Sequence, residues 1–311
     1  MKIIVTGYAG TLGRPLCAAL KAAGHAVYGI DLAHDELDWT RRADIGDYRQ
    51  VRDAIGFYEA DPESVVYHLA AEFGRHNGED YYDTLWRTNA VGTKNVLTVQ
   101  RERRFRLIFA SSSEVYGEGP FDRPLMDEAM TDRLAIRHHN DYAMSKWVCE
   151  QQIRNAARAW GTESMCLRFF NAYGPGERYT PYRSVVALFV YRAIRGLPYT
   201  VFRGYSRVFQ YVDDFIRTLA VAAERFVPGA VANIGGREYR PVADVHAILS
   251  EQLGLDPYRP AVAWADRDGH NTVSKRPDIR RAEELFGHDP RTTLSEGIKQ
   301  TIAWMRGEYG L

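Results

Sequence analysis

The chain has 311 residues, and its 40 basic and 40 acidic side chains give a formal net charge of zero. With 45% hydrophobic and 26% charged residues, it has the composition of an ordinary globular protein that can bury a sizeable core. The neutral balance gives no electrostatic reason to expect nucleic acid or an acidic membrane as a partner.

Several further features of the sequence indicate the cellular compartment and whether a metal site is expected. The chain begins in a strand pattern, MKIIVTG, unlike a cleavable leader, and no apolar stretch reaches the ~18 residues that span a bilayer. Three widely spaced cysteines without a Cys-x-x-Cys pair indicate buried thiols in a reducing compartment. His138 and His139 have no neighbours at metal-ligand spacing. We therefore expect a cytoplasmic protein without a metal site.

Short β-branched runs alternate with helical patterns over the first 170 residues. We expect strands at KIIVT, HAVYGID, SVVYHLA, RLIFASSS and ESMCLRFFN, and helices around residues 12–23, 48–58, 82–100 and 141–160. Apolar runs that are bounded by turn residues and separated by helix-length segments predict parallel strands covered on both faces. The expected fold class is therefore α/β, with a doubly wound parallel sheet.

A glycine-rich turn lies between the first predicted strand and the first predicted helix. Gly7, Gly10 and Gly13 form the pattern G-x-x-G-x-x-G. Glycine permits a tight turn and close approach of the backbone to a pyrophosphate, and the helix N-terminus supplies unpaired N–H groups. Asp31 ends the second predicted strand, where a carboxylate can accept both ribose hydroxyls. Together these features predict a Rossmann-type dinucleotide site.

Asp31 also indicates which dinucleotide binds. A carboxylate at this position repels the 2′-phosphate of NADP, and Leu32 and Ala33 follow it where an arginine would be needed. NAD is therefore the expected cofactor. NADP is the alternative, because Arg41 and Arg42 lie further along the same loop.

Tyr142 and Lys146 are four residues apart on a predicted helix, so their side chains share a face. To accept a proton near neutral pH, a phenol must have a pKa well below its ordinary value of about 10. A lysine ammonium one turn away and a cationic nicotinamide ring both favour the phenolate. The serines at 111–113 supply a hydroxyl at a strand end. The alternative is a Tyr and a Lys on an ordinary helix surface, where this spacing is common.

The pattern changes after Asn171. Proline and glycine become more frequent, as in YGPGERYTPY, RGLPYT and GLDPYRP, and the regular segments become shorter. We therefore expect an NAD-binding domain over residues 1–170. Residues 171–311 are expected to form a smaller, mostly C-terminal substrate-binding lobe that is interleaved with the end of the sheet.

A series of motifs resembles a known family. Besides the glycine turn and Asp31, the motifs are HLAA (68–71), TNAVGT (88–93), SSSEVYG (111–117), YAMSK (142–146), LRFFNAYGPG (167–176), RVFQYVDD (207–214) and the terminal KRPDIRRAEELFGHDP. The series is similar to that of the extended short-chain dehydrogenase/reductase family, in its nucleotide-sugar epimerase and dehydratase branch. The resemblance implies a nucleotide-diphosphate sugar as substrate and a homodimer as the assembly.

The resemblance also implies a role for each matching residue. Tyr142 would remove the C4 hydroxyl proton of the sugar as hydride leaves for NAD. Lys146 would hold the cofactor ribose and lower the pKa of Tyr142, and Ser112 would hydrogen-bond the C4 oxygen. The expected cofactor site comprises Gly7, Gly10, Thr11, Leu12, Gly13, Asp31, Asp44, Ile45, Leu69, Ala70, Ala71, Asn89, Tyr142 and Lys146, with Asp44 and Ile45 beside the adenine.

The same resemblance implies where the substrate lies. The expected substrate-binding residues are Ser113, Asn171, Arg207 and Arg276. Asn171 and Arg207 match positions that contact the diphosphate, and Arg276 matches a position that holds the nucleotide ribose or phosphate. The alternative for both arginines is a solvated place on the surface.

Glu114 distinguishes the reactions that a 4-keto sugar can undergo. Return of hydride to the other face gives a 4-epimer and needs no further base. Loss of the C6 hydroxyl, or of carbon dioxide from a C6 carboxylate, requires proton transfer at C5. Glu114 matches the position where dehydratases and glucuronate decarboxylases carry a glutamate, and many 4-epimerases have a small or apolar residue there.

We therefore favour C5/C6 chemistry that uses Glu114 as a fourth catalytic residue, by a decarboxylase or a 4,6-dehydratase. Ser113 replaces the Asp that often precedes this Glu in the dehydratases, and Ser-Ser-Glu is closer to the decarboxylases. The alternative is a nucleotide-sugar 4-epimerase, with Glu114 as a structural hydrogen-bond acceptor. A non-catalytic NAD-binding regulatory protein is disfavoured because Ser112, Tyr142 and Lys146 are all present.

Overall fold

The computed structural model describes residues 1–33, 37–118, 125–266 and 268–311. Its main sheet has seven strands, all parallel, in the order β11-β6-β5-β4-β1-β2-β3. These strands are β1 (Lys2–Thr6), β2 (Ala26–Asp31), β3 (Thr40–Arg42), β4 (Val65–His68), β5 (Arg106–Ser112), β6 (Ser164–Phe169) and β11 (Val231–Ile234). The chain leaves β1 in one direction to β2 and β3, and then returns to β4 on the other side. The predicted Rossmann-type doubly wound sheet is confirmed.

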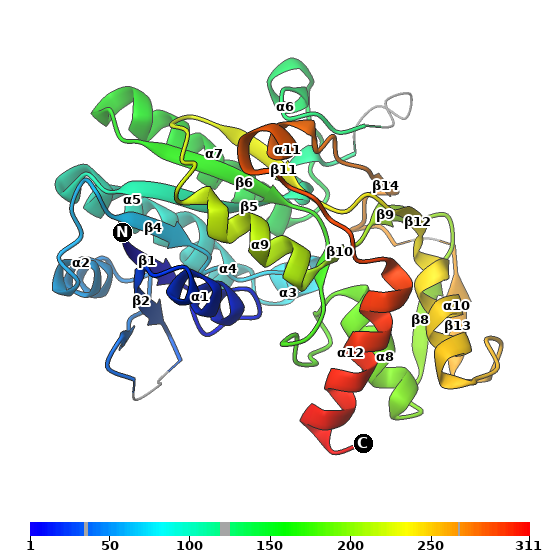
Figure 1. The fold of residues 1–311 in the computed structure, drawn as a ribbon. Coiled ribbons are helices and arrows are strands. Elements are labelled where there is room, and N and C mark those ends of the chain that lie inside the picture. The colour runs from blue at the N-terminus through cyan, green and yellow to red at the C-terminus, as the bar shows by residue number, and fades with distance from the viewer. Residues whose placement is uncertain (34–36, 119–124, 267) are drawn as a thin grey trace.

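Helices cover both faces of this sheet (Figure 1). The helices α1 (Gly13–Ala22) and α9 (Val212–Ala222) pack together on one face, while α2 (Tyr48–Phe57), α5 (Gly92–Arg103) and α7 (Asp141–Trp160) pack in sequence on the other. Successive residues of β1 divide between two buried clusters, with Ile3 in one and Ile4 in the other. This alternation follows from the two-residue repeat of a strand and explains why the strand is apolar throughout.

The predicted helix around residues 82–100 is interrupted. It consists of α4 (Tyr82–Trp86), a π-helical turn η1 (Arg87–Val91) and α5. The π-helical turn carries Asn89, whose amide bonds both backbone groups of Glu72 in the loop after β4. A π-helical turn accommodates one extra residue, which local sequence periodicity does not reveal.

The later part of the chain forms most of the lobe beside the sheet. Its helices are α8 (Val185–Ile194), α10 (Val242–Leu253) and α12 (Leu294–Tyr309), which Figure 1 shows grouped away from β1 and β2. Small sheets pair β7 (Ala172–Tyr173) with β10 (Gln210–Tyr211), β8 (Tyr199–Phe202) with β13 (Val262–Ala265), and β9 (Ser206–Val208) with β12 (Tyr239–Pro241) and β14 (Ser274–Lys275). The remaining elements are α3 (Arg75–Asp80), η2 (Ser113–Tyr116), α6 (Met130–Arg133) and α11 (Arg280–Phe286).

The sheet and the lobe are interleaved in the chain. Strand β11 comes from the later part but completes the edge of the main sheet beside β6. One buried cluster also joins Val5 of the sheet to Val190 of α8 and Leu249 of α10. The division of the chain at residue 170 stays a prediction. Across the described residues, none of the helices combines the length and the apolar character that a membrane crossing requires.

Candidate active site

A cavity of about 850 Å³ opens where β1, β4, β5 and β6 end. Its walls come from the glycine turn after β1, the loop after β4, the serines at the end of β5 and residues of the lobe. In a doubly wound sheet, ligands bind at the carboxyl ends of the strands, where the strand order reverses. The cavity therefore lies where the topology predicts a cofactor site.

The glycine turn leaves no room for a side chain at its first and last glycines. Gly7 has a φ of +77°, and a Cβ there would lie 2.6 Å from the backbone nitrogen of Ala70. A Cβ on Gly13 would lie 2.2 Å from the carbonyl oxygen of Gly7. Asp31 accepts hydrogen bonds from the backbone N–H groups of Ala9 and Ala33, both at 3.0 Å. The turn is thus packed tightly against the loop after β4, with one carboxylate fixed beside it, an arrangement that fits a dinucleotide.

Most of the other expected cofactor residues also line this cavity. They are Gly10, Thr11, Leu12, Ile45, Leu69, Ala70 and Ala71. Asp44 and Asn89 are not among the lining residues. Asp44 accepts from the backbone of Gly46 and from Arg87, each at 2.8 Å, and Asn89 braces the loop at Glu72. For these two residues, cofactor contact stays a prediction.

Tyr142 and Lys146 extend from α7 into the cavity, opposite Ser112 at the end of β5. Lys146 donates to the carbonyl of Ala110 at 2.8 Å, and its ammonium lies 6.0 Å from the centre of the Tyr142 ring. Burial lowers the pKa of Lys146 to about 8. Burial raises the pKa of Tyr142, and the Ser112 hydroxyl opposes this shift.

The direction of the Tyr142 shift qualifies the sequence-based expectation. Burial outweighs the opposing hydrogen bond with Ser112, so the high pKa of Tyr142 keeps its phenol protonated at neutral pH. Loss of that proton therefore needs added positive charge or a hydrogen bond to the phenolate in the occupied site.

Glu114 lies in η2, two residues beyond Ser112, and contacts Lys275 of β14. The side chain of Lys275 is 1% exposed and that of Glu114 is 12% exposed. Burial acts to raise the pKa of Glu114, but Lys275, Arg75 and Arg207 together hold it below its ordinary range. Burial lowers the pKa of Lys275 to about 8 despite the attraction of Glu114. The site therefore holds an ionised carboxylate beside an ammonium that can release its proton near neutral pH.

The expected substrate residues divide into two groups. Ser113, Asn171 and Arg207 line the cavity. The side chain of Arg207 donates to Asn271 at 3.2 Å, and its buried Nε has no protein partner among the described residues. Arg276 is exposed, lies 5.5 Å from the Tyr239 ring and is not among the lining residues. Its contact with substrate stays a prediction.

Two features of the site were not predicted from the sequence. They are the contact of Lys275 with Glu114 and the ion pair of Arg75 with Asp268. Lys275 directly precedes Arg276 in SKRPD, and strand alternation places only one of two neighbours inward. Arg75 bonds Asp268 at 3.0 Å and lines the same cavity. A strand of two residues is too short to show an alternating pattern, so only the folded chain reveals which neighbour is buried.

Comparisons with known proteins find a matching family and similar chains. The NAD dependent epimerase/dehydratase family model matches residues 3–235. The UDP-N-acetyl-alpha-D-glucosaminuronate decarboxylase of Bacillus cytotoxicus is 28% identical over 325 aligned positions, and the alignment covers 98% of each chain. The UDP-glucuronate 4-epimerase 2 of Arabidopsis thaliana is 27% identical over 343 aligned positions, and the alignment covers 99% of this chain and 76% of that protein.

A solved structure gives a similar picture. MoeE5 in complex with UDP-glucuronic acid and NAD is 28% identical, with a TM-score of 0.85, and the match covers 99% of this chain and 100% of that one. The family model spans most of the chain, and the glycine turn, Asp31 and the Tyr142–Lys146 pair lie together at the cavity. The chain therefore belongs to the NAD-dependent epimerase/dehydratase family, and NAD is its cofactor.

Proposed function

We propose that this enzyme removes carbon dioxide from a nucleoside-diphosphate hexuronate by way of a transient 4-keto sugar. The observation that carries the proposal is the buried pair of Glu114 and Lys275, because Glu114 lines the cavity together with Ser112 and Tyr142. The similarity to a decarboxylase of a nucleotide uronic acid, and to a structure that holds UDP-glucuronic acid with NAD, supports the choice of substrate class.

The first part of the reaction takes place at C4 of the sugar. We assign Tyr142 as the base for the C4 hydroxyl proton, and Ser112 as the group that holds the C4 oxygen. When bound, NAD would supply the hydride chemistry, as the oxidant of C4 in its oxidised form and as the reductant of the C4 ketone in the reduced form so produced. The ammonium of Lys146, 6.0 Å from the centre of the Tyr142 ring, favours the phenolate.

The second part takes place at C5 and C6. Once C4 is a ketone, the C6 carboxylate belongs to a β-keto acid. The C5–C6 bond breaks, carbon dioxide leaves, and the electron pair is held as the enolate until C5 takes a proton. Ionised Glu114 repels the substrate carboxylate, whereas the leaving carbon dioxide is neutral.

The proton for C5 comes from Lys275 in this proposal. Burial lowers the pKa of Lys275 to about 8, so its ammonium can release a proton near neutral pH. Lys275 is not among the residues that line the cavity, but Glu114 lines it and contacts Lys275. The proton therefore passes from Lys275 through the Glu114 carboxylate to C5 in one concerted transfer, because the lowered pKa of Glu114 keeps its carboxylate ionised before and after the step.

Two other reactions are the alternatives. A 4-epimerase needs only the C4 machinery, and the similarity to a UDP-glucuronate 4-epimerase favours it. A 4,6-dehydratase needs an acid and a base near C5 and C6, which Lys275 and Glu114 would provide. We favour decarboxylation because a buried ion pair at the cavity has no task in simple epimerisation, and because Ser113 stands where dehydratases often have Asp.

The test is incubation with NAD and a panel of nucleotide sugars that includes UDP-glucuronic acid, UDP-glucose and UDP-N-acetylglucosaminuronic acid. We expect a uronate to lose the mass of carbon dioxide and a neutral sugar to remain unchanged. Loss of water from UDP-glucose would indicate the dehydratase, and a 4-epimer of unchanged mass would indicate the epimerase. A homodimer, implied by the family resemblance, remains a prediction that light scattering would check.

A further inference from the structure

A fully buried arginine lies on β6, next to a residue that lines the cavity. Arg168 of β6 is 0% exposed, and Glu150 of α7 is 1% exposed. Glu150 accepts from Arg168 through both carboxylate oxygens, at 2.9 and 2.7 Å, and also from Ser111 at 2.5 Å. Such a pair is costly to bury unless every remaining hydrogen-bonding group is also satisfied.

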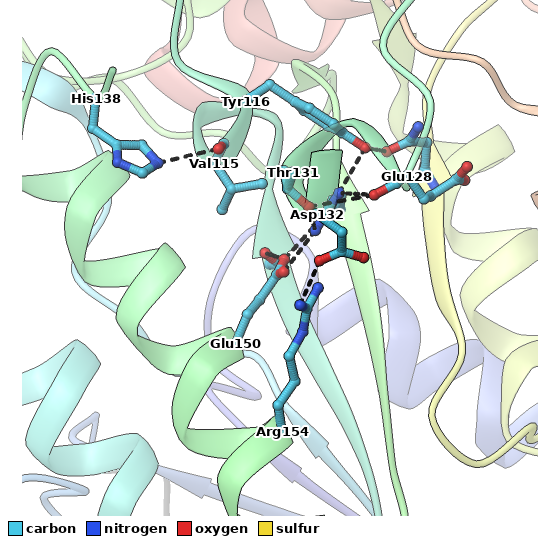
Figure 2. Close-up of polar contacts among 11 residues, drawn as sticks. Val115, Tyr116, Glu128, Thr131, Asp132, His138, Glu150 and Arg154 are labelled. Atoms are coloured by element: carbon cyan, nitrogen blue, oxygen red, sulfur yellow. Dashed lines mark hydrogen bonds and ion pairs between the residues drawn. The ribbon is translucent and has the colours of Figure 1, made fainter. Parts of the chain in front are cut away.

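The other guanidinium donors of Arg168 are all used. They bond the hydroxyl of Tyr116 at 2.9 Å, the carbonyl of Glu128 at 3.0 Å and the hydroxyl of Thr131 at 2.9 Å. All five N–H groups of the guanidinium therefore have acceptors. Figure 2 shows Glu150, Tyr116 and Thr131 converging from three separate elements.

The hydrogen bonds continue from Tyr116 to Asn233 and to the segment that follows Lys275. Tyr116 donates to Asn233 of β11 at 2.7 Å. The Asn233 amide donates in turn to the carbonyls of Met126 at 2.8 Å and of Asp278 at 3.1 Å. Asn233 therefore links the buried arginine to two separate backbone segments.

These two segments also bond each other. The backbone N–H of Met126 donates to the carbonyl of Arg276 at 2.8 Å, and the N–H of Asp278 donates to the carbonyl of Met126 at 3.0 Å. Arg276 directly follows Lys275 in the chain. The polar chain thus ends in the segment that carries the partner of Glu114.

We infer that Arg168, with Glu150, Tyr116 and Asn233, is a positioning network that fixes the C4 machinery relative to the Glu114–Lys275 pair. One end holds α7 one turn beyond Lys146, and it also holds Ser111, the neighbour of Ser112. The other end holds η2, which carries Glu114, and the segment after Lys275. None of these four side chains lines the cavity, so each acts through the residues that do.

This inference rests on the proposed function, because it assigns the two ends of the network to successive steps of one reaction. C4 oxidation requires Tyr142 and Ser112, whereas completion of the cycle requires the Glu114–Lys275 pair. A small displacement of one pair relative to the other leaves the first step intact and slows the second. Misplacement by ~1 Å can cost as much as 10²-fold in rate.

Tyr116→Phe tests the network with the smallest change. It removes the hydroxyl that joins Arg168 to Asn233 and keeps the ring, which lies 5.9 Å from Phe170. The matched control is Tyr67→Phe, because Tyr67 is 0% exposed and its hydroxyl donates to the carbonyl of Leu219 at 2.6 Å, outside the network. Both variants lose one buried hydroxyl, so a general loss of stability affects both.

The measurement is the partition of turnovers between completed product and released 4-keto sugar, with UDP-glucuronic acid and NAD as the probes. This ratio does not depend on the fraction of folded enzyme. We expect Tyr116→Phe to lower the ratio by about 10-fold, within the range that such misplacement produces, while the rate of C4 oxidation stays near the parental value. Tyr67→Phe should keep the parental ratio, and equal ratios in the two variants would overturn the inference.

Hydrogen exchange provides a second measurement that does not depend on the reaction. We expect faster backbone exchange over residues 274–278 in Tyr116→Phe and unchanged exchange there in Tyr67→Phe. If the parent enzyme gives only a 4-epimer, the proposed function fails, and the exchange result still decides whether the network holds this segment. Unchanged exchange in both variants would show that it does not.

Discussion

Lys275 contacts the carboxylate of Glu114 although 161 residues separate the two positions in the chain. The contact joins the 3-10 turn after β5 to the short strand β14 of the lobe. It places an ionised carboxylate at the cavity that Ser112 and Tyr142 also line, with a buried ammonium directly beside it. The pair thereby links the segment after β5 to the lobe, next to the cavity that residues of both the sheet and the lobe line.

Glu114→Gln should separate the two halves of the reaction. The amide is nearly isosteric but cannot carry the negative charge that holds Lys275 and repels the substrate carboxylate. We expect NADH and a 4-keto sugar to accumulate while formation of the completed product falls by about 10²-fold or more, the usual range for loss of acid–base catalysis. Absorbance at the NADH band together with product mass would check this.

The matched control for this change is Glu118→Gln, four residues further on, where the carboxylate pairs with His139 outside the cavity. Glu118→Gln should turn over at the parental rate. Equal rates of product formation by the parent and Glu114→Gln would remove Glu114 from the mechanism.

The pH dependence should report Lys146 and Lys275. Burial lowers the pKa of each to about 8, and both act in their protonated forms. We expect kcat/KM to fall above about pH 8. The slope of the logarithm of kcat/KM against pH should then approach the value for loss of two protons. Lys275→Arg keeps the charge to much higher pH, so the slope should approach one proton. A slope unchanged by this substitution would exclude Lys275 as a titrating group.

Tyr142→Phe should abolish C4 oxidation and leave NAD binding intact, because only the hydroxyl is removed. Rapid-mixing absorbance would follow NADH formation, and calorimetric titration would follow NAD binding. Tyr48→Phe is the control, since the Tyr48 hydroxyl bonds Glu102 at an exposed site. A Tyr142→Phe variant that formed NADH at the parental rate would contradict the assignment.

Asp31→Ala should weaken NAD binding by about 10- to 100-fold, since a hydrogen bond to a charged group contributes about 1.5–3 kcal/mol. It should also reduce the preference over NADP, because the carboxylate that repels the 2′-phosphate is gone. Arg41 lies 3.5 Å from the centre of the Phe57 ring, and it could pair with the 2′-phosphate of NADP only if this stacking contact broke. Asp38→Ala, at an exposed position, should keep both affinities. Equal binding of NAD and NADP by the parent would refute the role of Asp31.

Arg168→Met should lower the free energy of unfolding by about 3–5 kcal/mol, because it leaves the Glu150 carboxylate buried without its partner. Arg203→Met, which breaks an exposed pair with Asp266, should cost at most ~1 kcal/mol. Denaturant titration of both variants would check the difference. Similar small losses would mean that water or another cation reaches Glu150.

Local signals account for the elements that the sequence predicted best. The helix expected over residues 141–160 is confirmed as Asp141–Trp160. Asn140 caps it by accepting from the backbone of Ala143 at 2.8 Å, and Gly161 ends it with a φ of 63°. The glycine turn is equally local, so the cofactor site could be recognised before the fold was known.

Relationships that depend on tertiary packing could not be predicted in this way. Strand β11 has only four residues, and much of the lobe lies between it and its partner β6 in the chain. The pairing of Lys275 with Glu114 requires the lobe to fold against the end of β5. The raised pKa of Tyr142 depends on burial by several elements, whereas the helical spacing of Tyr142 and Lys146 indicated only their proximity.

Strand β11 has a consequence for how the chain can be divided. It covers the outer edge of β6, with Val231 opposite Cys166 and Ile234 opposite Phe169. A fragment that ended at residue 170 would expose a row of unpaired backbone groups along an apolar strand, which is a template for aggregation. A stable autonomous nucleotide-binding fragment would therefore have to include β11, for instance by a circular permutation that keeps residues 231–234 beside β6.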